Sequence, residues 1–303
     1  MSRPFKQVLP GLLRTYVRYM PVSPGKRSLW ARVIDPYFAW QSQPFVASTI
    51  FGMKVKGNAK DIIQQYIYYF GVWEPHLTRW ISHRLEPGDT FVDVGANIGY
   101  YSLLASRLVG KGGTVVAIEA SPTTFEELRV NLALNGVSNV RAVNIAAAES
   151  AGTVGIYRGH EYNTGLTTIL EGRGFDLECE VRSAPLSTIL HADEACNARL
   201  IKIDVEGAEW SVVAGMEPII NGGRPDLEII IEVNADLLAR DGKTADDLLR
   251  PFLEGGYHPY RVENDYSPLS YIPLPPEMRP QRIRHPIEGT VDIVFSRRDG
   301  EYL

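Results

Sequence analysis

The chain has 303 residues and the balance of an ordinary globular protein, with 45% hydrophobic and 22% charged residues. This composition excludes a mostly disordered chain and a collagen-like repeat, and two cysteines, Cys179 and Cys196, are too few for a disulfide framework. The net charge is −5, although the first 32 residues carry seven basic residues and no acidic one. The acidic remainder argues against a nucleic-acid partner, because the surfaces that bind nucleic acid are basic.

Residues 1–50 are expected to form a basic amphipathic extension. Apolar residues at helical spacing predict a helix from Pro10 to about Met20, with Pro10 in its first turn. Such a helix can lie on an anionic membrane, so residues 1–32 could make a peripheral membrane contact. Alternatively, its apolar face packs on the main domain or on a partner chain. No apolar run could span a membrane, and we expect the chain in the cytoplasm or at the inner face of the membrane.

Residues 51–303 are expected to form one main domain of α/β class. Apolar strands and helical patterns alternate along it, which is typical of a mostly parallel sheet with crossover helices. Strands are predicted at 90–94, 114–118, 140–145, 152–158, 178–181, 200–203, 228–233, 257–262 and 290–296. Helices are predicted at 98–109, 123–134, 206–214 and 244–253.

A proline-rich segment, 266–289, separates the last two predicted strands. Its six prolines predict a stiff loop and exclude a continuous helix. A loop that follows the carboxyl end of a strand lies on the ligand-binding side of an open α/β sheet. The segment is therefore either a lid over the site or a solvated connector.

The first motif with chemical meaning is the stretch 91–101, FVDVGANIGYY. A buried strand ends beside Asp93, and a turn with Gly95 and Gly99 leads into a helix whose first N–H groups are free. Glu119 ends the next strand, where an acid accepts hydrogen bonds from ribose hydroxyls. An acid beside the turn suits a cationic ligand better than a diphosphate. Together these features predict a nucleoside site for a positively charged ligand such as S-adenosylmethionine.

The second motif is LIKIDVEGAEW at 200–210, where another strand runs into a helix. Asp204 is expected at the carboxyl edge of the sheet, where ligands bind. Glu206 and Glu209 could serve the chemistry, or they could simply stabilise the first helical turn through the helix dipole. Gly207 inside that turn suggests that another group approaches closely.

These blocks, with GVWE at 71–74, EASP at 119–122 and IEVN at 231–234, resemble the FkbM-type methyltransferases, which are class I S-adenosylmethionine-dependent enzymes. The resemblance covers about residues 68–235. It implies a Rossmann-like sheet of seven mostly parallel strands with helices on both faces and an antiparallel last strand. It also implies an acceptor hydroxyl on a sugar, glycolipid or polyketide-like natural product.

The resemblance also assigns cofactor contacts. The methionine end would lie against the turn that begins at Asp93, with Glu74 near the ammonium group. Glu119 would bind the ribose, Ser121 would lie beside the ribose and adenine, and 144–146 would lie near the adenine. The cofactor-binding residues expected are Glu74, Asp93, Gly95, Ala96, Asn97, Gly99, Glu119, Ala120, Ser121, Asn144 and Ala146.

For the chemistry, we expect Asp204 or Glu206 to accept the proton of the acceptor hydroxyl, with Glu209 a third candidate. His160 is an alternative base. In a metal-assisted alternative, Asp204, Glu232 and Asn234 would hold magnesium through oxygen ligands.

Two other function classes remain open. A nicotinamide-dependent oxidoreductase would need a G-x-G-x-x-G turn, which the first strand lacks. A non-catalytic scaffold or membrane-docking module would not need the acids at the strand ends.

Overall fold

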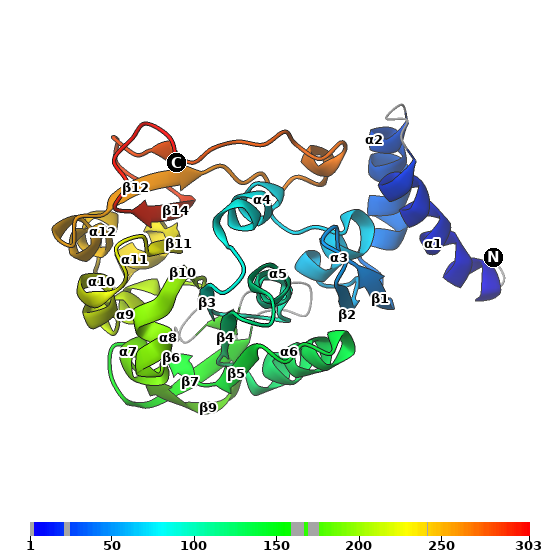
Figure 1. The fold of residues 1–303 in the computed structure, drawn as a ribbon. Helices are drawn as coiled ribbons and strands as arrows, with labels where there is room; N and C mark the ends of the chain where they lie inside the picture. Colours follow the sequence, from blue (N-terminus) through cyan, green and yellow to red (C-terminus); the bar gives the residue numbers. More distant parts are fainter. Residues whose placement is uncertain (1–2, 21–24, 159–166, 169–175, 241) are drawn as a thin grey trace.

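The computed structural model describes residues 3–20, 25–158, 167–168, 176–240 and 242–303 (Figure 1). Within them, one large sheet has eight strands. In spatial order these are β13 (Gln281–Arg282), β12 (His258–Val262), β14 (Thr290–Ser296), β11 (Glu228–Asn234), β10 (Ala198–Ile203), β3 (Thr90–Val94), β4 (Thr114–Glu119) and β5 (Val140–Asn144). Strands β11, β10, β3, β4 and β5 are parallel, and β14 runs antiparallel to both β11 and β12.

The α/β class and the antiparallel last strand are confirmed, whereas the expected count of seven strands is wrong. The eighth strand is the two-residue β13, which lies inside the proline-rich segment and pairs with β12. Only Gln281 and Arg282 of this segment pair with β12. A strand of two residues is too short to show a strand pattern in the sequence, so it was not predicted.

Two smaller sheets flank the large one. The first contains β6 (Ala146–Ala147), β7 (Gly152–Arg158), β8 (Thr167–Thr168) and β9 (Asp176–Ala184), and the second pairs β1 (Pro44–Ser48) with β2 (Lys54–Asn58). Strand β7 has the predicted bounds, and β9 extends the short strand predicted at 178–181. His160 lies outside the described residues.

Helices cover both faces of the large sheet, as expected (Figure 1). Alternate residues of one strand face opposite cores: Leu200 packs with α4 (Pro75–Arg84) and α5 (Tyr100–Val109), and Ile201 packs with α9 (Glu209–Ala214) and α10 (Glu217–Gly222). This alternation follows from the two-residue period of a strand. Further helices of the main domain are α6 (Pro122–Asn135), α7 (Leu186–Ile189), α8 (Ala192–Asn197), α11 (Ala235–Arg240), α12 (Ala245–Glu254) and the 3-10 turn η2 (Pro268–Tyr271).

Two helices begin later than the sequence pattern predicts. Helix α5 begins at Tyr100, because Gly99 precedes it with a left-handed φ of 91°. Helix α9 begins at Glu209, because Glu206 and Gly207 have φ values of 54° and 101°, which no α-helix accommodates. The expectation that Gly207 lies inside the first helical turn is therefore wrong. Glycine at this position is explained by its left-handed backbone conformation in the turn before α9.

The N-terminal extension packs on the main domain. Helix α1 (Arg3–Tyr19) contacts α3 (Ile62–Phe70), and the short helix α2 (Lys26–Leu29) leads into η1 (Trp30–Ala39). Val17 of α1 is buried in a cluster with Trp30 and Ile34 of η1. Pro10 lies inside α1, so its predicted place in the first turn is wrong. Apolar residues at helical spacing continue on the N-terminal side of Pro10, so the helix extends past it. Proline has no backbone N–H, and the helix tolerates the loss of this one hydrogen bond.

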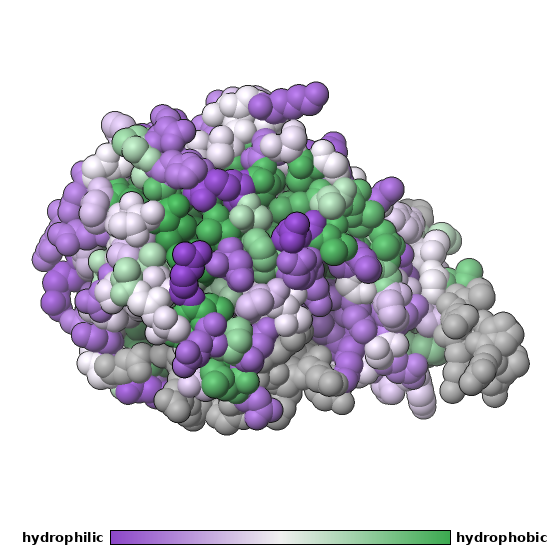
Figure 2. Space-filling model, turned by 90° about the horizontal axis from the view of Figure 1, so that it is seen from below, coloured by the Kyte–Doolittle hydropathy of each residue, from purple (hydrophilic) through white to green (hydrophobic). Residues whose placement is uncertain are grey.

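The surface carries apolar residues as well as this core. Figure 2 shows, on the face seen from below, a band of hydrophobic residues bordered by hydrophilic ones. On α1, Leu12 is 61% exposed and Tyr19 is 60% exposed. Among the described residues, no helix has both the length and the apolar character needed to cross a membrane.

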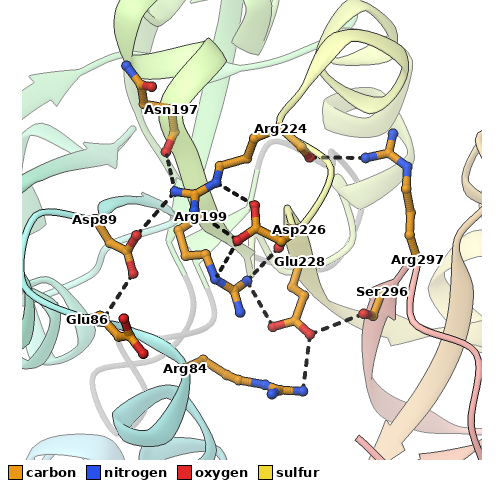
Figure 3. Close-up of polar contacts among 10 residues, drawn as sticks. All are labelled: Arg84, Glu86, Asp89, Asn197, Arg199, Arg224, Asp226, Glu228, Ser296 and Arg297. Atoms are coloured by element: carbon orange, nitrogen blue, oxygen red, sulfur yellow. Dashed lines mark hydrogen bonds and ion pairs between the residues drawn. The ribbon is translucent and has the colours of Figure 1, made fainter.

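The amino edge of the large sheet is held by an ion-pair network (Figure 3). Glu228, the first residue of β11, is buried and lies 3.2 Å from Arg84 and 3.1 Å from Arg199. Its other contact is the hydroxyl of Ser296, which donates a hydrogen bond at 3.1 Å. The network joins α4 to strands β10, β11 and β14, and leaves the opposite, carboxyl edge for the site.

Candidate active site

A cavity of about 450 Å³ lies at the carboxyl edge of the large sheet. This volume is within the range of small-molecule sites, about 300–1,000 Å³. Its walls come from the ends of β3, β4, β10 and β11, from the segment before α4, and from the proline-rich segment through Tyr266.

Three residues with unusual backbone conformations line this cavity. Glu74, Asn97 and Glu206 have φ values of 43°, 50° and 54°, and they are the non-glycine residues with positive φ in the described part of the chain. Such conformations cost about 1–3 kcal/mol each and gather at functional sites. Their shared location marks this cavity as the functional site.

The turn after β3 requires glycine at position 95. Gly95 has a φ of 80°, and a Cβ atom built there would lie 1.8 Å from the carbonyl oxygen of Asp204. The ends of β3 and β10 therefore approach each other backbone to backbone at the cavity floor.

Glu119 at the end of β4 holds the two neighbouring turns. Its carboxylate accepts hydrogen bonds from the backbone N–H of Asn97 at 2.8 Å and of Ser121 at 2.9 Å. The side chain lines the cavity, and burial raises its pKa to about 7 even though these two bonds favour the ionised form. Each oxygen keeps a lone pair that could accept a ligand hydroxyl.

Most of the predicted cofactor residues come together here. Those that line the cavity are Glu74, Gly95, Ala96, Asn97, Glu119, Ala120 and Ala146. Four others lie just behind the lining and support it. Gly99 and Ser121 cap helices, Asn144 donates to the carbonyl oxygens of Glu119 and Ala120, and Asp93 accepts a 2.6 Å hydrogen bond from Ser102.

Lys202 is a site residue that the sequence analysis missed. Its ammonium group is buried, lies 2.7 Å from Asp204 Oδ2, and stands directly across from Asp93 in the β10–β3 register. The ring of Tyr101 is 4.9 Å away, and Tyr101 donates a 2.5 Å hydrogen bond to Glu74. The neighbouring carboxylates raise the pKa of Lys202 despite its burial, so it stays charged. A lysine inside an otherwise apolar strand was the available signal.

Three carboxylates form the opposite end of the cavity. Oxygens of Asp204, Glu206 and Glu232 lie within 4.8 Å of one another. Burial, followed by repulsion from Asp204, raises the pKa of Glu232 to about 11. Tyr266 donates hydrogen bonds to Glu74 at 3.0 Å and to Glu232 at 3.4 Å, so Glu74 lies at the same end of the cavity as these carboxylates.

The third catalytic candidate, Glu209, lies away from the cavity lining. Its carboxylate accepts the backbone N–H of Gly207 at 3.0 Å and of Val205 at 3.4 Å, and burial raises its pKa to about 7. It fixes the turn that presents Asp204 and Glu206, and nothing in its position supports a role in proton transfer.

Two of the three residues expected to hold magnesium, Asp204 and Glu232, come together, and Glu206 rather than Asn234 is the third carboxylate or amide beside them. Asn234 lines the cavity, but its amide nitrogen donates to Thr290 Oγ1 at 2.9 Å and its amide oxygen accepts the N–H of Leu237 at 3.1 Å. The amide thus caps α11 and joins β11 to β14.

The proline-rich segment is anchored beside the cavity. Tyr266 packs against Trp73 with ring centroids 5.5 Å apart, and Tyr271 packs against Tyr66 at 4.7 Å. The hydroxyl of Tyr271 accepts the backbone N–H of Glu74 at 3.1 Å. The segment therefore covers one side of the cavity and positions Glu74.

A family model supplies the decisive comparison. The model described as "Methyltransferase FkbM domain" matches residues 93–259, which is more than half of the chain. The chain belongs to the FkbM methyltransferase domain family. The matched region runs from β3 through β12 and so contains most of the cavity. Family and fold together support methyltransferase function dependent on S-adenosylmethionine.

Curated relatives agree with this assignment. Methyltransferase sdnD of Sordaria araneosa is 28% identical over 51% of this chain and 76% of its own length. The 31-O-demethyl-FK506 methyltransferase FkbM of Streptomyces tacrolimicus is 31% identical over 44% of this chain. The chain spans 61% of that relative and 60% of Methyltransferase 1 of Beauveria bassiana. A solved S-adenosylmethionine-dependent O-methyltransferase of Thermotoga maritima aligns over 84% of this chain and 79% of its own, with 14% identity and a TM-score of 0.41.

Proposed function

We propose that the protein transfers the methyl group of S-adenosylmethionine to a hydroxyl oxygen of a sugar, glycolipid or polyketide-like acceptor. The observation that carries this proposal is the placement of acids at both ends of one cavity: Glu119 at the nucleoside end and the Asp204–Glu206–Glu232 cluster at the other.

The residues present fit this cofactor. Glu119 lines the cavity with lone pairs suited to ribose hydroxyls, and the small residues Ala120 and Ala146 leave room for a base beside it. Glu74 is buried at the far side, where it could accept a hydrogen bond from an ammonium group. When bound, the cofactor supplies a methyl group activated by a sulfonium charge.

The acceptor end suits an alcohol. The sulfonium carries the reactivity, so the protein mainly has to orient the acceptor oxygen and take its proton. Glu206 and Glu232 provide carboxylates, and the aromatic pair of Trp73 and Tyr266 provides an apolar wall. The name of the FK506 relative, which specifies a 31-O-demethyl substrate, supports oxygen as the accepting atom.

The experiment is a labelled methyl transfer. The protein is incubated with trideuteromethyl-labelled S-adenosylmethionine and a fractionated cell extract, and labelled products are sought by mass spectrometry. We expect a product whose label survives mild base, because a methyl ether is stable where a methyl ester releases methanol. Label found only on base-labile esters, nitrogen or carbon would contradict the hydroxyl acceptor, and no transferred label would favour a non-catalytic scaffold.

A further inference from the structure

The amino-terminal region, residues 1–60, differs from the rest of the chain in charge and in exposed apolar surface. Its sequence contains ten basic residues and one acidic residue, Asp35, although the whole chain has a net charge of −5. Single exposed apolar residues need no explanation, whereas a concentration of them marks an interaction surface. Of the fifteen large hydrophobic side chains that are exposed in the described part of the chain, seven lie in this region: Leu12, Tyr19, Met20, Tyr37, Trp40, Val46 and Ile50.

Helix α1 turns basic side chains toward the protein and apolar ones toward solvent. The guanidinium of Arg14 lies 4.8 Å from the centre of the Tyr68 ring, and Arg18 is also partly buried. Leu12 and Tyr19 are exposed, and because they are seven residues apart they lie on one stripe of the helix. A helix whose outer face meets only water normally carries charged residues there. The outer stripe of α1 is therefore suited to an apolar partner.

Exposed cations accompany these apolar side chains. Alternate residues of β1 and β2 face outward, and the register places Val46 directly across from Lys56, with Lys54 on the same face of the pair. Arg32 of η1 is exposed as well. The outer surface of the amino-terminal region thus combines apolar and basic side chains.

We propose that the amino-terminal region docks on the surface of an anionic lipid membrane. Its basic side chains are attracted to anionic headgroups, and its apolar and aromatic side chains enter the boundary between headgroups and acyl chains. A second copy of this chain fits the surface less well, because a symmetric contact would bring two basic surfaces together.

The docking region is joined to the wall of the cavity. Helix α1 packs against α3, and Ile62 and Ile63 at the start of α3 line the cavity. Helices α1 and α2 project from the side of the molecule opposite α12 (Figure 1). Docking therefore holds the α3 wall of the cavity close to the membrane and leaves α12 facing away from it.

Vesicle sedimentation of the full chain tests this proposal without cofactor or acceptor, so its outcome is independent of the proposed function. Vesicles of phosphatidylcholine alone are compared with vesicles of equal parts phosphatidylcholine and phosphatidylserine. We expect binding to the anionic vesicles alone, and weaker binding as the salt concentration rises from about 0.1 M to about 1 M, because the Debye length falls to about 3 Å. No binding, equal binding to both vesicles, or binding that salt does not weaken would overturn the proposal.

A double variant tests the apolar contribution. Leu12→Glu with Tyr19→Glu should weaken binding to the anionic vesicles by at least about tenfold, because apolar burial is lost and negative charge is added. The matched control is Leu253→Glu with Tyr302→Glu, which changes the same residue types at exposed positions outside the amino-terminal region and should bind within a few-fold of the wild type.

A second double variant tests the basic contribution. Lys54→Gln with Lys56→Gln should weaken binding by about 5–30-fold, since each basic residue near an anionic surface contributes about 1 kcal/mol. Its control, Lys111→Gln with Arg250→Gln, removes the same charge at exposed positions elsewhere. Equal weakening in either variant and its control would overturn the proposal, because net charge alone would then explain the binding.

Analytical ultracentrifugation tests the alternative occupant. We expect the wild type and Leu12→Glu with Tyr19→Glu to have the same oligomeric state. A wild-type dimer that this variant separates into monomers would mean that the stripe of α1 covers a second copy, and would overturn the proposal. Because the changed residues are exposed, the thermal midpoints of the variants should match the wild type. If a variant fails to fold, the lipid and salt dependence of the wild type still decides.

Discussion

Replacing Lys202 with methionine should destabilise the protein strongly. The substitution keeps the length of the side chain but removes the buried ammonium that lies 2.7 Å from Asp204 and across from Asp93. Removing one partner of a buried ion pair typically costs about 3–5 kcal/mol, because the remaining charge is left uncompensated. Here the carboxylates of Glu74 and Asp93 also lose the positive charge that lowers their pKa values.

The stability deficit of Lys202→Met should depend on pH, and the direction of this dependence follows from the carboxyl groups around Lys202. Without Lys202, the native carboxyl groups of Glu74 and Asp93 bind protons more strongly than the same groups do in the unfolded chain. The native variant therefore gains stability as the pH falls. Urea unfolding of the wild type and Lys202→Met should show a deficit of about 3–5 kcal/mol at about pH 8 and a smaller one at about pH 5.5. Lys111→Met, at an exposed site, is the matched control. A deficit below about 1 kcal/mol, or one that is equal at both pH values, would refute the reasoning.

Four further outcomes are expected. Gly95→Ala should abolish cofactor binding and lower the thermal unfolding midpoint, because the Cβ of the new alanine would overlap the carbonyl oxygen of Asp204. Wild-type cofactor affinity measured by calorimetry would contradict this expectation. Glu228→Gln should lower the free energy of unfolding in urea by about 1–3 kcal/mol. Cofactor affinity should stay unchanged, because the ion pairs of Glu228 lie at the opposite edge of the sheet, and a large change in Kd would contradict this separation. A chelator should leave turnover unchanged, as Lys202 already neutralises Asp204; loss of activity restored by magnesium would instead favour metal assistance. Leu12→Glu with Tyr19→Glu should reduce sedimentation with anionic vesicles if α1 binds membranes, and equal sedimentation would remove that contact.

Features encoded by local sequence were predictable. Gly136 ends α6 in a left-handed conformation, as the Asn-Gly pair indicated, and the strand predicted at 290–296 has the bounds of β14. The turn at Gly95 and the acid at Glu119 were also found, because each depends on a strand end and the residues just after it.

Features created by tertiary contacts were not predictable in the same way. The sequence showed neither that Lys202 faces Asp93 nor that Asp292 faces Glu232, because both pairings depend on strand register between segments far apart in the chain. The position of Tyr266 depends on packing against Trp73, almost 200 residues earlier. Glu209 was expected in the chemistry because its backbone contacts within the turn leave no mark in the sequence pattern.

The proposed function requires that the cavity at the ends of β3, β4 and β10 binds an adenosyl sulfonium. The most direct measurement is a crystal structure of the protein grown with S-adenosylhomocysteine, the stable product. We expect the adenosyl group in this cavity, with ribose hydroxyls hydrogen-bonded to Glu119 and the amino-acid end toward Glu74. A ligand bound elsewhere, or bound here without any contact to Glu119, would contradict it.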